Sequence, residues 1–166
     1  MDSYNPHLRG EVVALEPLIE AHAAELFPLY ADDDVWTYVD TPPPKSLEAL
    51  MARHRRLESR RSPDGSEIWL NWAVRAEEDV VGFVEATVRQ NSEVEIAYFI
   101  GKRFWGEGFG TDAVATMLAF LGERFPQGAF WATVDSRNGP SVRLLTRLGF
   151  NVIDDADPHN VRFRFA

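Results

Sequence analysis

Apolar and polar residues follow strand-like patterns in the middle of the chain and predict a three-stranded meander. Residues 68–75 and 80–88 are apolar segments joined by the short polar stretch AEED, which favours an antiparallel hairpin. Residues 93–100 form a third strand in which side chains alternate: Val94, Ile96, Tyr98 and Ile100 on one face, and Glu93, Glu95, Ala97 and Phe99 on the other. Residues 129–134 are apolar enough for an interior strand, and the C-terminal VRFRFA alternates as a last strand.

Helical spacing of apolar residues is found in one segment before the predicted meander and in two segments after it. Ser46 is a suitable N-cap for a helix whose apolar face also contains His54, which we expect to be packed in the core; that face consists of Leu47, Leu50, Met51 and Leu57. The basic positions of the same segment are expected to form a solvated face: Arg53, Arg55, Arg56, Arg60 and Arg61. A second helix is predicted from the apolar set Ala113, Val114, Met117, Leu118 and Leu121. A third has clear end signals, with Asn138 as cap, Pro140 in the first turn and Gly149 as a left-handed stop.

The prolines of the N-terminal part indicate where its strand, helix and loop begin and end. The stretch LRGEVVALEP has the pattern of an edge strand, and Pro17 suits the first turn of a helix that runs toward Tyr30. Pro28 is expected to kink or end that helix. DTPPPKS, before Ser46, is predicted to be an irregular loop.

Size and composition limit the choice of class. With 166 residues, 45% of them hydrophobic, the chain is predicted to form a single domain over residues 1–166. No window approaches the roughly 18 continuous apolar residues of a membrane span, and the start lacks a basic-then-apolar signal region, so we expect a cytoplasmic protein without a membrane partner. The chain has no cysteine, which excludes disulfides, thiolate metal sites and a cysteine nucleophile. A net charge of -9 argues against a nucleic-acid partner and favours cationic ligands such as amines.

Three alternating glycines separate a strand from a helix at Gly106, Gly108 and Gly110. A strand that leads through glycines into a helix N-terminus presents free backbone N–H groups and the positive end of the helix dipole, an arrangement that binds phosphate; a purely structural turn is the alternative. A nucleoside-triphosphate loop is excluded because Thr111 and Asp112, rather than Lys followed by Ser or Thr, come after the last glycine.

A dinucleotide site is a second alternative for the same glycines. Gly108, Gly110 and Ala113 satisfy G-x-G-x-x-A, and Asp135 lies close to the expected position of a ribose-binding acid. The surroundings argue against it, because few elements follow Asp135 and an antiparallel meander precedes the glycines.

Two motifs together resemble the GNAT superfamily of N-acyltransferases. FWGEGFGTDA is similar to the coenzyme-binding motif R/Q-x-x-G-x-G/A, with Trp105 where Arg or Gln is usual. NGPSVRLLTRLGF is similar to the second motif of the family, matched by Asn138, Ser141, Leu148, Gly149 and Phe150. The resemblance covers nearly the whole chain and is greatest to the branch typified by ribosomal-protein N-terminal alanine acetyltransferases, the RimJ/RimL type. It implies an α/β GNAT fold, a twisted, mixed and mostly antiparallel sheet flanked by helices.

The resemblance also implies a site for acetyl-CoA, with no metal. The backbone amides from Gly106 to Thr111 are expected to hold the pyrophosphate, Phe99 and Ile100 the pantetheine arm, and Asn138 and Ser141 the thioester end. The expected coenzyme-binding residues of the glycine turn are Trp105, Gly106, Glu107, Gly108, Phe109, Gly110 and Thr111. Fixed N–H donors suit a pyrophosphate, and an open strand edge suits an arm that carries amides.

The expected reaction is direct attack of a neutral amine on the thioester, which requires a base. Glu95 is the first candidate, with Glu93, Glu85 and His54 as alternatives. Leu145 occupies the place where many family members have a tyrosine acid, so Ser141 or a water is expected to assist the leaving thiolate. The acceptor pocket is expected to draw on aromatic residues, for which the candidates are Trp36, Tyr38, Trp69 and Trp72.

These features together predict an N-acetyltransferase that acts on a primary amine, either a protein N-terminus or a small molecule, as a monomer or homodimer. A non-catalytic acyl-CoA sensor is the alternative, favoured by the missing tyrosine. A nicotinamide-dependent oxidoreductase is a third, weaker alternative.

Overall fold

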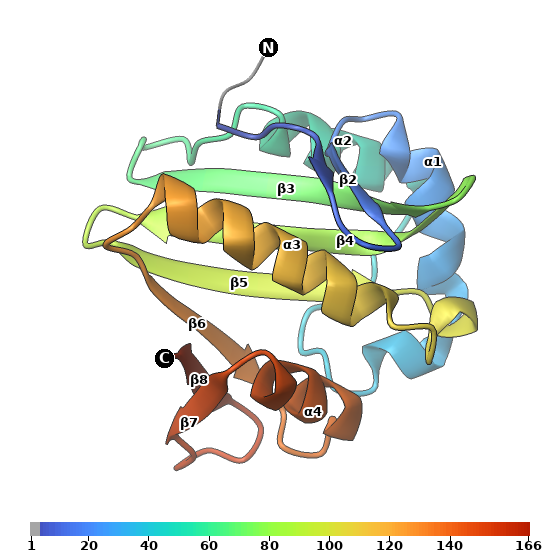
Figure 1. The fold of residues 1–166 in the computed structure, drawn as a ribbon. Coiled ribbons are helices and arrows are strands. Elements are labelled where there is room, and N and C mark those ends of the chain that lie inside the picture. Colours follow the sequence, from blue (N-terminus) through green and yellow to red (C-terminus); the bar gives the residue numbers. More distant parts are fainter. Residues whose placement is uncertain (1–3) are drawn as a thin grey trace.

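The computed structural model describes residues 4–166 and contains one mixed eight-stranded sheet (Figure 1). The strands lie in the order β1-β2-β3-β4-β5-β6-β8-β7. Their bounds are Leu8–Arg9 (β1), Ala14–Pro17 (β2), Glu67–Ala76 (β3), Asp79–Arg89 (β4), Glu93–Ile100 (β5), Ala129–Val134 (β6), Phe150–Asp154 (β7) and Val161–Phe165 (β8). All neighbouring strands are antiparallel except β5 and β6. The sheet is therefore the twisted, mixed and mostly antiparallel one that the sequence predicts.

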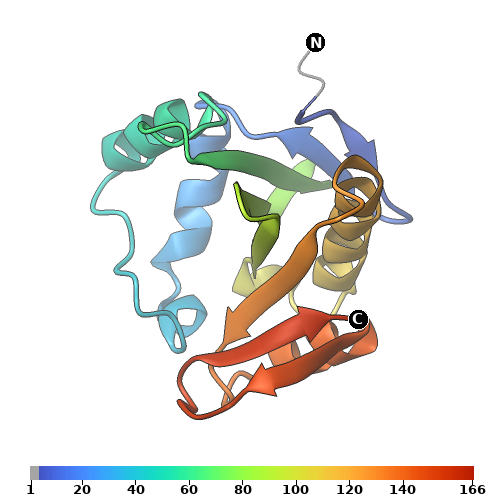
Figure 2. The same cartoon turned by 90° about the vertical axis from the view of Figure 1, so that its left-hand side faces the viewer.

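Helices cover both faces of this sheet (Figures 1 and 2). The α-helices are α1 (His22–Leu26), α2 (Leu47–Leu57), α3 (Phe109–Arg124) and α4 (Gly139–Arg147), and the short 3-10 helices are η1 (Phe27–Ala31), η2 (Asp33–Trp36) and η3 (Lys102–Phe104). Helix α3 contributes Ala113, Val114, Met117 and Leu121 to the main core. Helices α1 and α2 enclose a second, smaller core on the other face, around Leu26 and Leu50. None of the helices within residues 4–166 is long and apolar enough to cross a membrane.

The predicted meander is confirmed as β3, β4 and β5. The turn between β3 and β4 is tighter than the polar stretch AEED implied, because only Glu77 and Glu78 lie outside the strands. Glu77 adopts a φ of 54°, the left-handed conformation that tight hairpin turns require. The register places Glu85 of β4 opposite Ala97 of β5 and beside Asn71 of β3.

The predicted N-terminal strand and helix are wrong in their bounds. The chain turns back at Gly10, so that two short strands, β1 and β2, form a hairpin in place of one edge strand. Pro17 does not start a helix, because it pairs with Trp72 of β3 as the last residue of β2. The helix α1 begins only at His22 and becomes the 3-10 helix η1 near Pro28, which has no N–H to continue α-helical bonding.

The predicted helix caps are confirmed. Ser46 Oγ accepts a hydrogen bond from the Ala49 N–H at 3.1 Å at the start of α2. Asn138 Oδ1 accepts one from the Ser141 N–H at 3.3 Å at the start of α4. Gly149 has a φ of 99° and ends that helix, as a left-handed stop does.

Strands β5 and β6 pair over a very short length and then separate. Their parallel ladder contains three residue pairs, from Glu93 opposite Ala129 to Glu95 opposite Trp131. Beyond these pairs β6 runs away from β5 toward β8, β7 and α4 (Figures 1 and 2). The separation leaves a cleft in the middle of the sheet, at the C-terminal ends of both strands.

Candidate active site

A cavity of about 450 Å³ opens at the place where β5 and β6 separate. One wall comes from the two strands and the start of α4, and it includes Phe99, Asn138 and Ser141 of the predicted coenzyme site. The opposite wall comes from η1, η2, the proline-rich loop and α2. The cavity therefore connects the expected thioester end of the coenzyme site with elements that precede the meander.

The glycine turn lies at the N-terminus of α3, beside the end of β5. Gly106 and Gly108 both have a φ of 80°, which favours glycine, and a Cβ atom built on either would meet no atom within 4 Å. Gly108 is the N-cap of the 16-residue helix α3 and supplies no side-chain cap. The first N–H groups of α3 have no acceptor within the helix, and no side chain caps them from Gly108. The turn is thus open on the side where an anion would bind, and it fits a pyrophosphate.

Gly110 has a different role from the other two glycines. A Cβ atom there would lie 3.3 Å from Leu144 of α4 and 3.4 Å from Ile100 of β5. The absence of a side chain at Gly110 therefore allows α3 to pack closely against both elements. Of the three glycines, two are needed for the backbone conformation and one for packing.

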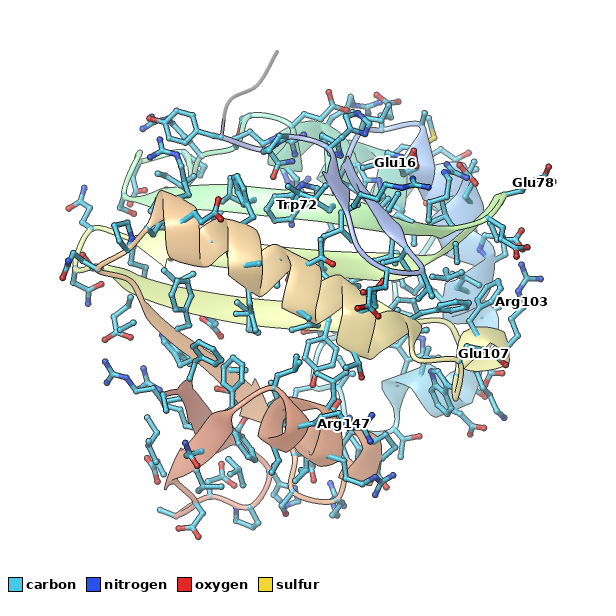
Figure 3. All side chains as sticks on the ribbon, viewed as in Figure 1. Glu16, Trp72, Glu78, Arg103, Glu107 and Arg147 are labelled. Atoms are coloured by element: carbon cyan, nitrogen blue, oxygen red, sulfur yellow. The ribbon has the colours of Figure 1, made fainter. Side chains whose placement is uncertain are left out.

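Trp105 links the glycine turn to the end of β5. Its indole Nε1–H donates to the Ile100 carbonyl at 2.7 Å, although Trp105 is 49% exposed to solvent. Phe109 packs against Phe104, with ring centroids 6.4 Å apart. Glu107 projects from the exposed turn before α3 (Figure 3). The residues predicted at this end of the site, Ile100 and Trp105 to Thr111, are thus grouped around the start of α3.

Glu95, the first candidate for the base, lies where the sheet is still closed. It belongs to the last residue pair between β5 and β6, and its carboxylate accepts a 2.9 Å hydrogen bond from Arg89. Arg89 also pairs with Glu67 at 3.2 Å. Glu95 is not among the residues that line the cavity within the described part of the chain. Glu93 likewise lies before the cleft, 3.6 Å from Arg162.

Glu85, an alternative in the sequence analysis, lines the cavity instead. Its carboxylate accepts a hydrogen bond from Asn71 Nδ2 at 2.9 Å. Burial raises the pKa of Glu85, while the positive charge of Arg53 and the Asn71 hydrogen bond act to lower that pKa. A carboxyl group with a raised pKa at the wall of a cavity is a candidate general base.

Ser141 and Tyr98 meet at the other wall of the cavity. The Tyr98 hydroxyl donates to the Ser141 carbonyl at 3.3 Å and so ties β5 to the first turn of α4. Burial raises the pKa of Tyr98 to about 12. Leu145 is fully buried in the main core, so the position that holds a tyrosine in many family members does not face the cavity here. The alternation of side chains in β5 predicts the face of the sheet on which Tyr98 lies, but it does not predict the contact between Tyr98 and α4.

The four aromatic candidates for the acceptor pocket divide into two pairs. Trp36 and Tyr38 line the cavity. Trp72 does not, because it is fully buried beneath α3, with its ring 5.8 Å from that of Phe120 (Figure 3). The Trp69 indole N–H donates to Glu67 at 2.9 Å, away from the cavity. Three other aromatic residues also line the cavity: Tyr30, Phe83 and Phe99.

His54 and Asp135 also line the cavity but are held by other groups. His54 is buried in α2, and its Nδ1 lies 3.3 Å from the Ile19 carbonyl; burial lowers its pKa to about 4. The Asp135 carboxylate accepts hydrogen bonds from Arg137, which hold its pKa well below the usual range. A ribose-binding role for Asp135 would require it to give up these bonds.

The sequence of residues 13–151 matches the family described as acetyltransferase (GNAT) domain. Because this match spans most of the chain and the fold is the one that the family shares, the protein belongs to the GNAT acetyltransferases. A curated relative, the uncharacterized N-acetyltransferase p20 of Bacillus licheniformis, is 32% identical over 62 residues, which cover 37% of this chain and 35% of that protein.

Solved structures with the same fold include several acetyltransferases. A structure of RimL, described as a ribosomal L7/L12 alpha-N-protein acetyltransferase in complex with coenzyme A, is similar over 96% of both chains, with a TM-score of 0.79 and 16% identity. Mycobacterium smegmatis RimJ, in complex with a CoA disulfide, is similar over 96% of this chain and 85% of its own, with a TM-score of 0.78 and 19% identity. At these identities the likeness shows the fold.

Proposed function

We propose that this chain is an acetyl-CoA-dependent N-acetyltransferase of the RimJ/RimL type, a single domain that transfers an acetyl group directly to a primary amine. The observation that carries the proposal is the cavity, which places Glu85 on one wall and Asn138 and Ser141 on another, beside the separated strands. A proton acceptor and the expected thioester end thus share one cavity.

The coenzyme is expected to lie along the cleft. The N–H groups of Gly106 to Thr111 would bind the pyrophosphate, and the free edge of β5 at Phe99 and Ile100 would bind the amides of the pantetheine arm. RimL and RimJ, whose structures hold coenzyme A or its disulfide, share this fold. Bound acetyl-CoA supplies the acetyl group as a thioester, and the chain's own residues orient it and handle the protons.

Glu85 is the proposed base. It takes one proton from the substrate ammonium, and the freed nitrogen lone pair attacks the thioester carbonyl carbon. The carbon–nitrogen bond forms and the carbon–sulfur bond breaks. The nitrogen gives up its second proton, and the departing sulfur takes up that proton. Ser141 lines this cavity and its hydroxyl makes no hydrogen bond within residues 4–166, so the hydroxyl is available to pass that proton to the sulfur.

Mass spectrometry of amines and peptides incubated with acetyl-CoA, together with measurement of released thiol, tests this proposal. We expect one N-acetylated product for each thiol released. Tight acetyl-CoA binding without transfer to any amine would overturn the proposal and favour a sensor. NADH binding without acetyl-CoA binding would favour the oxidoreductase.

A further inference from the structure

Two donor groups in the cavity have no hydrogen-bond partner within the described residues and are not used by the proposed reaction. They belong to Tyr30 of η1 and Arg53 of α2, and both residues line the cavity. Within residues 4–166, neither the Tyr30 hydroxyl nor the Arg53 guanidinium makes a hydrogen bond or an ion pair. Donor groups at a cavity wall without a protein partner are available for a ligand.

The Tyr30 side chain is held in place by contacts of its ring with two other aromatic rings. The ring lies 5.0 Å from that of Phe99 and 5.5 Å from that of Trp36, measured between centroids. The Tyr30 carbonyl accepts a hydrogen bond from the Trp36 indole at 2.9 Å, which also holds the backbone. Burial raises the pKa of Tyr30, so the hydroxyl keeps its proton and acts as a donor.

Arg53 differs from its neighbours on α2. Arg55 pairs with Glu20 at 2.6 Å outside the cavity, as a solvated arginine does. Arg53 is the only lysine or arginine among the described residues that line the cavity. Arg53 is exposed, as Arg55 is, but it lines the same cavity as Tyr30 and Glu85.

We infer that Arg53 and Tyr30 together bind a carboxylate of the acceptor, and that the acceptor is a small free α-amino acid with an apolar side chain. This inference rests on the proposed function. Arginine binds carboxylates strongly through its planar pair of N–H groups, and a tyrosine hydroxyl adds a third donor. Glu85 and Arg53 line the same cavity, so an acceptor that carries an amine and a carboxylate on one α-carbon can meet both residues at once.

The remaining walls suit the rest of such a molecule. Trp36, Phe83 and Phe99 present aromatic surface to the cavity, and Phe83 stacks on Phe99 at 5.6 Å. An apolar side chain would be buried against these rings. The N-terminus of a peptide has an amide in place of the carboxylate and would leave the charge of Arg53 without a partner.

Paired acceptors test the inference: L-phenylalanine and L-leucine against L-phenylalaninamide and L-leucinamide, each with acetyl-CoA. We expect kcat/KM to be at least about tenfold higher for the free acids, the factor that a charge-assisted hydrogen bond supplies. Arg53→Gln should reduce this preference by about tenfold, and Tyr30→Phe, which keeps the ring, by a smaller factor. Arg55→Gln is the matched control and should leave the preference unchanged.

Three results would overturn the inference. Amides or peptides used as well as free acids would show that no carboxylate is bound. An Arg53→Gln variant that loses the same factor with acid and amide would show that Arg53 acts only through Glu85. Transfer to no amine at all would overturn the proposed function as well, whereas transfer without a preference for acids overturns this inference alone.

Discussion

At the scale of single residues, burial separates the carboxylates of the central sheet into two kinds. Glu95 is partly exposed and is neutralised by Arg89. Glu85 is desolvated, and its carboxylate accepts a hydrogen bond from the Asn71 amide but has no ion-pair partner within residues 4–166. Burial raises the pKa of Glu85, which makes it the carboxyl group of the central sheet with the properties of a proton acceptor in the cavity.

A pair of isosteric variants tests which glutamate is the base. Glu85→Gln should lower kcat by about 100-fold or more at neutral pH, because the substrate amine then keeps its proton. Partial recovery at high pH, where the amine loses its own proton, should follow. Glu95→Gln, the matched control, should retain most of the activity while acetyl-CoA affinity stays the same in both. The reverse ranking would assign the base to Glu95.

His54 makes stability depend on pH. Burial disfavours the charged form of His54 and lowers its pKa to about 4 in the folded protein, below the ordinary value of 6.5 that is expected in the unfolded chain. As the pH falls through 6.5 the unfolded chain takes up this proton first, so stability is lost between pH 6.5 and pH 4, by about 3 kcal/mol in total.

Urea unfolding at several pH values measures this loss. The variant His54→Asn keeps an N–H donor near the Ile19 carbonyl but does not titrate, so the slope of stability against pH should flatten in this window. An unchanged slope in the variant would show that other groups cause the acid sensitivity.

At the scale of elements, one aspartate attaches the glycine turn to the edge of the sheet. The Asp112 carboxylate, in the first turn of α3, accepts hydrogen bonds from the backbone N–H groups of Glu11, Val12 and Val13 at 3.0, 2.8 and 2.9 Å. A Cβ atom at Gly10 would lie 2.5 Å from the same carboxylate. The β1–β2 turn and the start of α3 are thus held together by a single side chain.

Asp112→Asn should therefore destabilise the fold. The amide keeps one oxygen acceptor but turns an NH₂ group toward backbone donors, at a cost of roughly 1–3 kcal/mol. Glu123→Gln, on the exposed side of the same helix, is the control and should change stability by less than about 0.5 kcal/mol. Equal unfolding midpoints for the two variants in urea would contradict this role for Asp112.

The elements show what local sequence can and cannot predict. The caps at Ser46 and Asn138 and the stop at Gly149 were predicted because each signal acts within a few residues. Pro17 was assigned to a helix because its local preference is real, but pairing with Trp72, 55 positions away, decided its conformation. In the same way, the sequence ranks Glu95 above Glu85, whereas only Glu85 lines the cavity, because the surroundings of both depend on where β5 and β6 separate.

At the scale of the whole molecule, ligand binding should stabilise the fold through the glycine turn. At a concentration one hundredfold above its Kd, acetyl-CoA should add about 2.7 kcal/mol to the free energy of unfolding. Gly108→Val should lose most of this gain, because the side chain would occupy the open side of the turn and because a φ of 80° strains a β-branched residue.

Thermal shift with and without acetyl-CoA measures the gain for each variant against itself. Gly122→Ala is the control on the same helix: its Cβ would meet no atom within 4 Å, so the ligand-induced shift should persist while basal stability rises by up to about 1 kcal/mol. A full ligand-induced shift in a folded Gly108→Val variant would show that the coenzyme does not bind at this turn.

The three-pair ladder between β5 and β6 also has a consequence for amide hydrogen exchange. Beyond Glu95, the β5 amides that point away from β4 have no strand opposite them within the described chain, although they lie in the middle of the sheet. Those at residues 96–100 should exchange with deuterium faster than the amides of β4, and should become protected when acetyl-CoA is bound. Slow exchange at these positions in the free protein would mean that the cleft closes in solution. Fast exchange there would instead make the centre of this sheet its most labile part until acetyl-CoA is bound.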